Sequence, residues 1–552
     1  MDSLQHETDF SLNESLQNVS KNLRIVSLCT IGSRVLGLMR DQAMGVLFGA
    51  GPVMDSFTVA FRLPNLARVL LGEGALTTAF LPVFVSELHE RGSESAARVT
   101  WAVFLSLAAF LCSMIFLFEG AVWSLGWFMP LSPEATLLRN LSALLMPYVV
   151  LICLAAQLGA VLNALGKFVW PALVPSILNL VWLLSLWCLA PLWQDDVNQA
   201  YLIGVCVLIG GVLQLLFPLI ILYSSGFGFR SDWRLAMGRV WKIATDMLPV
   251  IIGMSITQLN AVLDSFIAWG FTQSADQSLL MPLPGSPRYP LPEGTATALY
   301  LGQRLYQFPL GVFGVALGTV LFPLLTSHAQ RGETDKLRAD ISLGIRLVIA
   351  IGLPASVGLI LIGHPLATLF FEYGKFNAED ARQTGDMIAA YGSGVWAYCG
   401  LLILQRGFYA IGDRLTPMYI GLAAMFANLF LNLTLIWPLG GRGLALATAI
   451  VAACQCAATA LVLQRHVGRL HWGEIGQTTL KTIVATAVMS VICQVLLNLL
   501  DSSGLLFGRA IRLGVPLTAG AIAFLLSARL LGLVEPWLVI AGKRSPVSNL
   551  ES

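Results

Sequence analysis

Charged side chains interrupt the apolar stretches of this chain, and their types indicate which chemistry those stretches could support. A charge at the centre of a bilayer costs about 2.5–3.5 kcal/mol on insertion scales, so each needs a reason to be there. Arginine predominates, and its guanidinium offers a rigid fork of donors that suits phosphate. The basic members are Arg34, Arg40, Arg62, Arg68, Arg304 and Arg406, and the acidic members are Asp41, Asp55, Glu73 and Asp264.

The arginines predict a diphosphate site inside a membrane cavity. Arg34 and Asp41 are seven residues apart and share one helix face. Arg62 and Arg68 flank Pro64, which breaks its apolar stretch. We expect Arg34, Arg68 and Arg304 to converge on this cavity. The competing interpretation pairs Arg40 with Asp41 and lets the other arginines extend to the membrane interface.

A second group of residues predicts a cation site. Asp264 lies in the middle of an apolar stretch with no basic residue within a helical turn. A buried carboxylate of this kind either takes up a proton or binds a cation. Asn428 and Asn432 share a helix face, and Thr448 and the Leu444 carbonyl add further oxygens. The group suits Na⁺, with two alternatives: the ion is a proton, or the asparagines only join helices.

Several other chemistries are excluded or weakly supported. The acidic pair Asp195-Asp196 stands alone, so there is no cluster to hold Mg²⁺ with phosphates, as a polyprenyl-phosphate transferase would need. No glycine-rich nucleotide loop occurs, so we expect no ATP-driven cycle. The nine cysteines lie in apolar stretches without metal-binding spacing, and a net charge of +2 gives no reason to expect nucleic acid. No tightly bound cofactor is expected, and the chain is predicted to be a transporter rather than an enzyme.

The elements that carry these residues are predicted to be transmembrane helices. Hydrophobic residues make up 56% of the 552-residue chain and charged residues only 12%, against roughly 25% in soluble proteins. Mean hydropathy is +0.76. The sequence therefore predicts an all-α integral membrane protein with about fourteen spans of the required length. These are 23–48, 54–90, 97–126, 135–165, 169–192, 199–224, 238–272, 295–327, 340–372, 382–411, 416–438, 443–465, 477–500 and 509–534.

Two of these spans have weak points, and the loops between spans predict the orientation. Pro64 and Gly72-Glu73-Gly74 interrupt the second span, and the eighth span is rich in glycine.

Lysine and arginine concentrate in alternate loops, which places both termini in the cytoplasm. The polar first 20 residues lack the apolar core of a signal peptide. The proline-rich stretch 273–294 is expected to be a long loop on the outside.

An internal repeat divides the chain into two lobes. Arg62-Leu63 followed by Pro82 and Arg91-Gly92 matches Arg304-Leu305 followed by Pro323 and Arg331-Gly332. The stretch 164–171 likewise matches 410–417, and the offsets of the two matches are 240 to 246 residues. Six spans separate the copies, so both halves insert in the same orientation, related by a pseudo-twofold axis along the membrane normal. We expect a cytoplasmic tail at 1–22, an N-lobe at 23–225, a C-lobe at 236–466, two extra helices at 475–535 and a second tail at 536–552.

The N-terminal motifs closely resemble those of the MurJ (MviN) family. They are Ser33-Arg34-Val35-Leu36-Gly37, Arg40-Asp41, Phe48-Gly49-Ala50-Gly51, Asp55-Ser56-Phe57, Phe61-Arg62-Leu63-Pro64-Asn65 and Gly72-Glu73-Gly74-Ala75. Phe308-Pro309, Gly314-Val315-Ala316-Leu317-Gly318-Thr319 and Asp413-Arg414-Leu415-Thr416-Pro417 resemble its second half. The likeness extends over about residues 20–535 and is most specific in the first ninety.

The resemblance implies a flippase for lipid II, the undecaprenyl diphosphate-linked disaccharide-pentapeptide of peptidoglycan synthesis. Such proteins have two six-helix lobes of the multidrug/oligosaccharidyl-lipid/polysaccharide exporter type plus two helices, and they work by alternating access in the bacterial inner membrane. Functionally required family residues correspond to Ser33, Arg34, Arg40, Asp55, Arg68 and Arg304, and Arg62 occupies a basic position.

The resemblance also implies an energy source and partners. Some family members bind sodium among helices seven, eleven and twelve, so coupling to Na⁺, to H⁺ or to the membrane potential is expected. Membrane lipids and other cell-wall synthesis proteins are the expected partners besides lipid II. The alternatives are a related exporter of drugs or of another polyprenyl-linked oligosaccharide, and a membrane transferase.

Overall fold

The computed structural model describes residues 2–128, 131–230, 232–272, 288–500 and 506–541, and these residues are almost entirely helical. They form two compact units, which are described separately. The first contains residues 1–48 and 52–262, and the second contains 49–51 and 263–552. The division falls inside helix α8 (Met237–Gly270), some way after the lobe boundary that the sequence predicts between 225 and 236.

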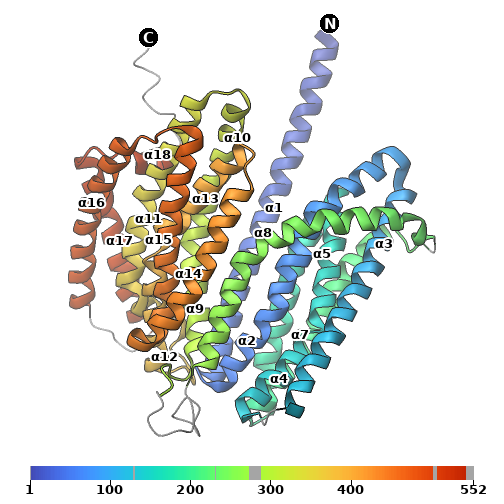
Figure 1. Ribbon diagram of the computed structural model, residues 1–552, viewed down its shortest axis with the longest axis horizontal. Coiled ribbons are helices and arrows are strands. Elements are labelled where there is room, and N and C mark those ends of the chain that lie inside the picture. The colour runs from blue at the N-terminus through green and yellow to red at the C-terminus, as the bar shows by residue number, and fades with distance from the viewer. Residues whose placement is uncertain (1, 129–130, 231, 273–287, 501–505, 542–552) are drawn as a thin grey trace. The chain divides into compact units, whose positions relative to one another are not determined.

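The first unit consists of helices α1 to α7 and most of α8 (Figure 1). Their bounds are α1 Asp2–Phe48, α2 Pro52–Ala67, η1 Arg68–Leu76, α3 Thr77–Phe128, α4 Pro133–Leu145, α5 Tyr148–Ala164, α6 Val169–Leu184, η2 Ser185–Leu189, η3 Ala190–Leu192, α7 Asp196–Ser224 and η4 Trp233–Ala236. Its core holds Phe80 and Phe84 of α3 and Leu158 of α5, all fully buried. Because lipid is as apolar as these side chains, they stabilise the unit through close packing between helices rather than through removal from water.

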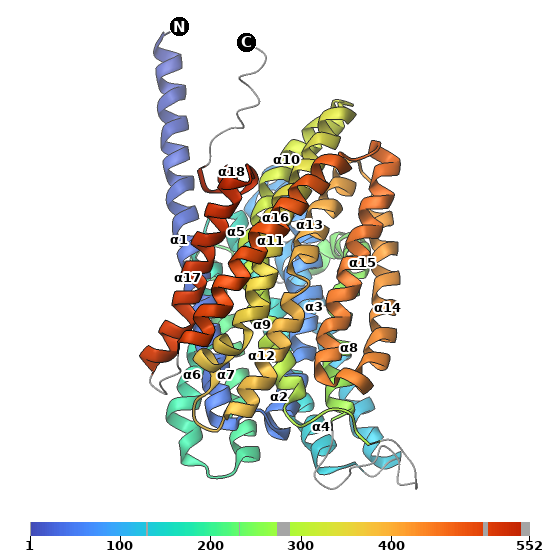
Figure 2. The ribbon, with the colours of Figure 1, turned by 90° about the vertical axis from the view of Figure 1, so that its left-hand side faces the viewer.

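The second unit contains the remaining helices, with α11 packed against α12, α13, α16 and α17 (Figure 2). Their bounds are α9 Thr295–Pro309, η5 Leu310–Val315, α10 Ala316–Gln330, α11 Thr334–Phe371, α12 Ala378–Gly392, α13 Val395–Ala410, α14 Leu415–Leu439, α15 Gly441–Val467, α16 Trp472–Leu499, α17 Leu506–Leu530 and α18 Glu535–Ala541. Of the loop predicted at 273–294, residues 273–287 lie outside the described part of the chain.

Local sequence signals begin and break these helices. Asn377 and Asp380 form a capping box at the start of α12. Asp413 accepts hydrogen bonds from the amides of Leu415 and Thr416 at the start of α14. These hydrogen bonds, led by those with Thr416, outweigh burial and hold the pKa of the Asp413 carboxyl below its usual value. Gly92, with φ of 78°, allows a sharp kink within α3.

Irregular helical turns occur at both predicted weak points. Single π-helical segments occupy Arg68–Leu76, which contains Gly72 and Gly74, and Leu310–Val315, which contains Gly311 and Gly314. Their starts differ by 310 minus 68, or 242 residues, which matches the offset of the predicted repeat. π-helical turns of this kind are frequent at functional sites because they re-aim side chains within a helix.

Among the described residues, ten helical stretches are long and apolar enough to cross a membrane, or twelve when two bent pairs are counted. One of the ten, Pro52–Ser124, contains the kink at Gly92 and covers two of the predicted spans. Helix α1 is not among them, and its apolar half contains Arg34, Arg40 and Asp41. The multi-helix membrane fold is therefore confirmed, whereas the number fourteen stays a prediction.

Candidate functional site

Arg40, on α1, is held inside the first unit by contacts on every side of its guanidinium. The side chain is 6% exposed, and Nη2 lies 2.7 Å from Asp41 Oδ1. Nη1 donates to Asn179 Oδ1 at 3.1 Å, and the guanidinium stacks 4.5 Å from the centre of the Trp182 ring. Asn179 and Trp182 belong to α6, so this ion pair joins the first and sixth helices of the unit.

Arg34 lies on the same helix but has different surroundings. The residue is exposed, and its side chain makes no ion pair or hydrogen bond with any of the described residues. Ser33 beside it is half-buried, and its carbonyl accepts a hydrogen bond from Asn179 Nδ2 at 3.1 Å. Asn179 therefore contacts both Ser33 and Arg40 and fixes the helix face from which Arg34 projects.

The remaining predicted residues of the first unit lie on α2 and at its end. Asp55, near the start of α2, is 2% exposed. Arg62 lies about two helical turns further along α2 and is half-buried. Arg68 begins the π-helical segment, and its Nε and Nη2 donate to Asn65 Oδ1 at 3.2 and 2.9 Å. This short-range bond orients the Arg68 guanidinium beside the break that follows Pro64.

Close packing positions this irregular segment. A side-chain carbon added at Gly72 would lie 3.3 Å from Cys153 Cα on α5, and one added at Gly74 would meet the end of the Met254 side chain on α8. Gly72 therefore allows close approach of the α5 backbone, and Gly74 that of Met254. The segment after Arg68 is thus wedged between α5 and α8 and cannot straighten without moving them.

Arg304 is the predicted site residue of the second unit. It is exposed on α9, six residues before the π-helical turn that begins at Leu310. Its Nη2 donates to the Tyr300 hydroxyl at 3.0 Å, and the guanidinium lies 5.3 Å from the centre of that ring. The aromatic face leaves the planar group oriented and solvent-accessible. Whether Arg304 converges with Arg34 and Arg68 stays a prediction, because they belong to different units.

The five residues predicted to bind a cation do meet in the second unit. Asn432 Nδ2 lies 2.6 Å from Asp264 Oδ1 and 2.8 Å from Asn428 Oδ1. Thr448 Oγ1 lies 3.4 Å from Asp264 Oδ2 and 3.2 Å from the Leu444 carbonyl. Asp264, Asn428 and Asn432 are each 5% exposed or less. Helices α8, α14 and α15 thus bring together one carboxylate and several neutral oxygens, hereafter the Asp264 cluster.

This chemistry fits a small monovalent cation. Hard cations prefer carboxylate, amide, hydroxyl and carbonyl oxygens, all of which occur here. One carboxylate neutralises one positive charge, whereas a divalent ion would remain uncompensated in an environment of low dielectric. Among the described residues, no group of three histidine, cysteine, aspartate or glutamate side chains is placed to hold a metal ion. The Asp264 cluster therefore fits Na⁺ rather than a transition metal.

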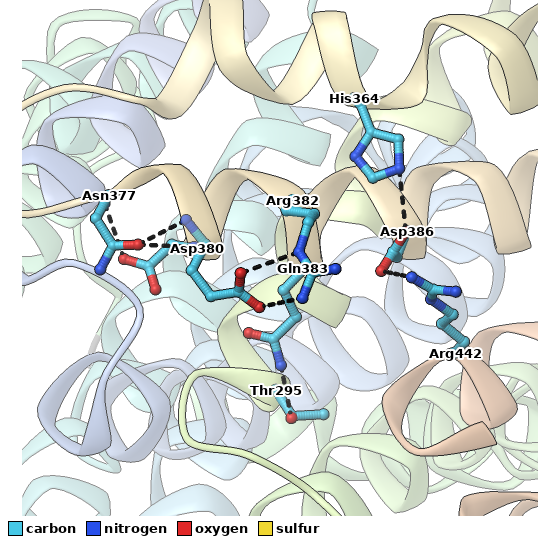
Figure 3. A network of polar contacts seen from close by, with 9 residues as sticks. Thr295, His364, Asn377, Asp380, Arg382, Gln383, Asp386 and Arg442 are labelled. Carbon is cyan, nitrogen blue, oxygen red and sulfur yellow. Dashed lines mark hydrogen bonds and ion pairs between the residues drawn. The ribbon is translucent and has the colours of Figure 1, made fainter. Parts of the chain in front are cut away.

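Sequence reasoning missed a polar network at one end of the second unit, shown in Figure 3. Asp386 on α12 accepts hydrogen bonds from His364 Nε2, at 3.1 Å, and from Arg442 at the start of α15. Gln383 donates to the Thr295 hydroxyl at 2.9 Å. The network joins α9, α11, α12 and α15, and so positions the turn of α15 that carries Leu444. No sequence signal indicates which of these polar residues meet.

Two clusters attach the C-terminal helices to α11. At one end, the buried carboxylate of Glu535 forms an ion pair with Arg346 Nη2 at 2.6 Å. The same carboxylate accepts a hydrogen bond from the Thr478 hydroxyl at 2.8 Å. At the other end, Arg509 Nη2 lies 2.9 Å from Glu372 Oε1. Burial raises the pKa of the Glu535 carboxyl, but hydrogen bonds from its backbone, Thr478 and Arg346 outweigh burial and leave the pKa below 4.5. Glu535 is therefore ionised at neutral pH.

Comparison with known proteins identifies close relatives. A family model described as lipid II flippase MurJ matches residues 44–511. The probable lipid II flippase MurJ of Vibrio cholerae is 35% identical over 442 residues, covering 78% of this chain and 79% of the relative. That of Rhizobium tropici is 30% identical over 530 residues, covering 94% and 95%. The first relative thus matches more than three quarters of this chain and the second nearly all of it.

The fold also resembles solved structures. A lipid II flippase MurJ in an inward closed conformation matches 92% of this chain and 98% of its own, with a TM-score of 0.70 and 22% identity. An inward-facing multidrug resistance transporter of the MATE family matches 79% and 94%, with a TM-score of 0.60 and 13% identity. At these identities the likeness concerns the fold alone, and it agrees with the exporter architecture predicted from the repeat.

Proposed function

The chain belongs to the MurJ family of lipid II flippases, and we propose that it moves lipid II from the inner to the outer leaflet by alternating access. It is a transporter and not an enzyme. The observation that supports the diphosphate role best is Arg34, an arginine of an apolar helix whose guanidinium is exposed and unpaired among the described residues. Such a group is held ready for an anionic ligand.

We assign the diphosphate of the substrate to Arg34, Arg68 and Arg304, with Ser33 and Asp55 completing the site. Arg34 and Arg304 are exposed, and Arg68 lies at a helix break that re-aims its side chain. Two phosphates carry several acceptor oxygens, and each guanidinium can bind a pair of them. Arg62 adds positive charge at the edge of this site, and the buried Arg40–Asp41 pair supports the helix face that carries Ser33 and Arg34. Drug export is not favoured, because the likeness to MATE transporters is weaker and limited to fold.

The polyprenyl tail is assigned to α16 and α17. A long hydrocarbon chain gains nothing by entering a polar cavity, so it should remain against apolar surface in the bilayer. The outward residues of these helices are large and apolar and well exposed, as at Leu480, Val491 and Ile522. The clusters at Glu535 and Arg509 attach both helices to α11, so the surface would move together with the second unit.

We propose that the membrane potential drives the transport cycle and that Na⁺, bound at the Asp264 cluster, is the coupling ion. Asn432 stands where a second carboxylate would strengthen the site, so H⁺ remains the alternative ion. We place the protein in the bacterial inner membrane with both termini in the cytoplasm, as the distribution of lysine and arginine favours. Other cell-wall synthesis proteins are its proposed partners besides lipid II and the surrounding lipids.

Complementation tests the transport function. A bacterium depleted of its own flippase should survive and keep its shape when this chain is expressed. Lipid II labelling on the outer surface measures translocation directly. If the chain is expressed in the membrane at the level of the native flippase and translocation does not recover, the function assigned here is wrong.

Sodium-dependent melting tests the cation site. The purified chain should gain thermal stability when choline chloride is replaced by NaCl at equal ionic strength, because an ion that binds only the folded state stabilises it. Asp264→Ala should abolish this gain. Equal melting temperatures of the unaltered chain in both salts would exclude Na⁺ at the Asp264 cluster and leave Asp264 as a structural or proton-carrying residue.

A further inference from the structure

Tyr398, on α13, ends in a hydroxyl that the rest of the fold leaves without a partner. Its oxygen is inaccessible to solvent and makes no hydrogen bond with any residue in the described part of the chain. Buried hydroxyls almost always have a partner, because leaving one unpaired costs free energy. A buried tyrosine whose hydroxyl has no hydrogen-bond partner among the described residues therefore suggests that a ligand supplies the missing interaction.

Packing forces the hydroxyl into its position. The Tyr398 ring lies 5.1 Å from the ring of Tyr306, which in turn stacks 5.0 Å from Tyr391. These two neighbours are 7% and 2% exposed, so the stack is anchored in the core. The ring of Tyr398 cannot swing away without opening the stack, and its hydroxyl is consequently preorganised.

The hydroxyl end of the ring points toward the helix that carries Thr448. A side-chain carbon added at Gly394 would lie 2.9 Å from Tyr398 Cζ and 3.0 Å from Ala449 Cα. The absence of a side chain at Gly394 therefore lets the end of the tyrosine approach α15 at the residue next to Thr448. This approach places the end of the Tyr398 ring next to the part of α15 that contributes Thr448 to the Asp264 cluster.

We propose that the Tyr398 hydroxyl is a further oxygen ligand of the monovalent cation bound at the Asp264 cluster, an inference that rests on the cation site proposed above. A neutral hydroxyl adds an oxygen without adding charge, so the balance of one carboxylate against one Na⁺ is kept. In the ion-free state the hydroxyl stays unpaired, and ion binding satisfies it. Tyr398 would thereby join α13 to the three helices that already surround the ion.

Tyr398→Phe tests the proposal, because it removes only the hydroxyl and keeps the stacked ring. Sodium titrations of melting temperature would be recorded for the full-length purified chain in NaCl and choline chloride mixtures of constant ionic strength. The variant should need about tenfold more Na⁺ for half of the stabilisation, the loss expected for one good ligand. In choline chloride alone the variant should melt no lower than the unaltered chain, because the Tyr398 hydroxyl of the unaltered chain has no sodium ion to bind there.

Thr384→Val provides the matched control. Thr384 lies in the same unit, is fully buried and also has a hydroxyl without a partner among the described residues, but it belongs to no part of the Asp264 cluster. Its sodium titration should match that of the unaltered chain. Tyrosine difference absorption during titration of the unaltered chain gives a second readout that requires no variant, and binding should perturb it.

The outcomes separate this inference from the cation site itself. If the unaltered chain responds to Na⁺ and Asp264→Ala does not, while Tyr398→Phe titrates like the unaltered chain, then Tyr398 is no ligand and the site stands without it. If the unaltered chain shows no response to Na⁺, both the cation site and the role of Tyr398 are wrong. Equal weakening in Thr384→Val and Tyr398→Phe would also overturn the inference.

Discussion

Two kinds of arginine occur in the apolar helices, and they differ in what their guanidinium groups contact. Arg40 is buried against Asp41, Asn179 and Trp182, whereas Arg34 is exposed six residues earlier on the same helix. A buried pair contributes to the fold mainly because removing one partner leaves the other charged and alone. An exposed arginine contributes little to the fold and is available to a ligand.

Replacing Arg34, Arg68 or Arg304 with alanine should abolish complementation while leaving membrane expression unchanged. Each change removes charge-assisted hydrogen bonds worth about 1.5–3 kcal/mol, so lipid II binding should fall at least roughly tenfold. Lysine should restore little, because it lacks the planar fork. The measurement is survival on depletion together with native-state binding of lipid II. Arg382→Ala is the control, since Arg382 is exposed and pairs only with the neighbouring exposed Glu379.

Arg40→Ala should instead lower stability. It would remove the 2.7 Å ion pair from the buried Asp41 carboxylate, at a cost of about 3–5 kcal/mol. We expect a lower melting temperature in detergent and reduced expression. The double variant Arg40→Ala, Asp41→Ala should recover part of the stability. If the double variant is stable yet fails to complement, Arg40 acts in transport as well; if Arg40→Ala melts normally, its contacts with Asp41 and Asn179 do not support the fold.

At the scale of the helix, attachments at both ends of α11 hold the C-terminal pair α16 and α17. Arg346 of α11 contacts both Glu474 of α16 and Glu535 of α18, and Arg509 of α17 reaches Glu372 at the opposite end. Between these clusters the contact is apolar, with Ala350, Ala485 and Met489 buried in one core. We therefore expect α16 and α17 to move together with α11 as one rigid group.

Glu535→Gln should weaken this attachment at neutral pH but hardly at acid pH. The folded pKa of Glu535 lies below its unfolded value of about 4.3. A lowered pKa stabilises the fold above the unfolded pKa, and this contribution is lost as the pH falls through the folded pKa. The difference in melting temperature between the two proteins should therefore be large at pH 7 and shrink below about pH 4. Glu379→Gln, which alters an exposed carboxylate, should leave the melting temperature nearly unchanged at both pH values.

Removing the C-terminal pair should stop transport of the long-chain lipid. A chain ending near residue 471, before α16, keeps all helices up to α15 and the Asp264 cluster. We expect it to bind a short-chain analogue of lipid II but to fail in complementation, because no apolar surface remains for the polyprenyl tail. Survival supported by a truncated chain that is verified in the membrane would contradict the assignment of the tail to α16 and α17.

At the scale of the whole molecule, the membrane potential acts on every charge that moves during alternating access. Each charge responds by about 2.3 kcal/mol per 100 mV, and the inside of the cell is negative. The empty arginine site carries net positive charge and is drawn inward, whereas the diphosphate-loaded site is nearly neutral. The potential should therefore reset the empty carrier and leave the loaded step almost unaffected.

Collapsing the potential alone should slow repeated turnover severalfold and leave the first translocation intact. Proteoliposomes with labelled lipid II and a potassium ionophore would measure both phases, with the proton gradient held constant as control. If turnover continues at its full rate without a potential, the arginine charge does not reset the carrier. A slowed first translocation would mean that the loaded site keeps more charge than two phosphates allow.

The sequence by itself determined the class of fold and the local breaks within it. Apolar runs of membrane length can be read residue by residue, and so can glycines and prolines that interrupt a helix, as at Gly72 and Gly314. The two irregular turns lie at the weak points that these residues indicate, and their starts differ by 310 minus 68, or 242 residues, close to the repeat offset. These properties depend on near neighbours in the chain, so a linear sequence contains the information.

The residues of the Asp264 cluster show how much of a binding site can be predicted from residue type and spacing. Asp264 stands out because a carboxylate in an apolar stretch is costly, and Asn428 and Asn432 stand out because their spacing places them on one face. The structure brings these residues together across 168 positions of chain. It also adds Tyr398, which no pattern indicates, because an unpaired hydroxyl becomes visible only once every possible partner has been placed.

Only the tertiary structure decided which polar residues meet. Arg40 and Asn179 are 139 residues apart, and Arg346 and Glu535 are 189 apart. Periodicity shows which face of a helix a residue occupies, but not which helix will lie against that face. That choice depends on how all the helices pack at once. Consequently the sequence indicated that buried charges must have partners, and the fold determined whether each partner is another side chain or a ligand.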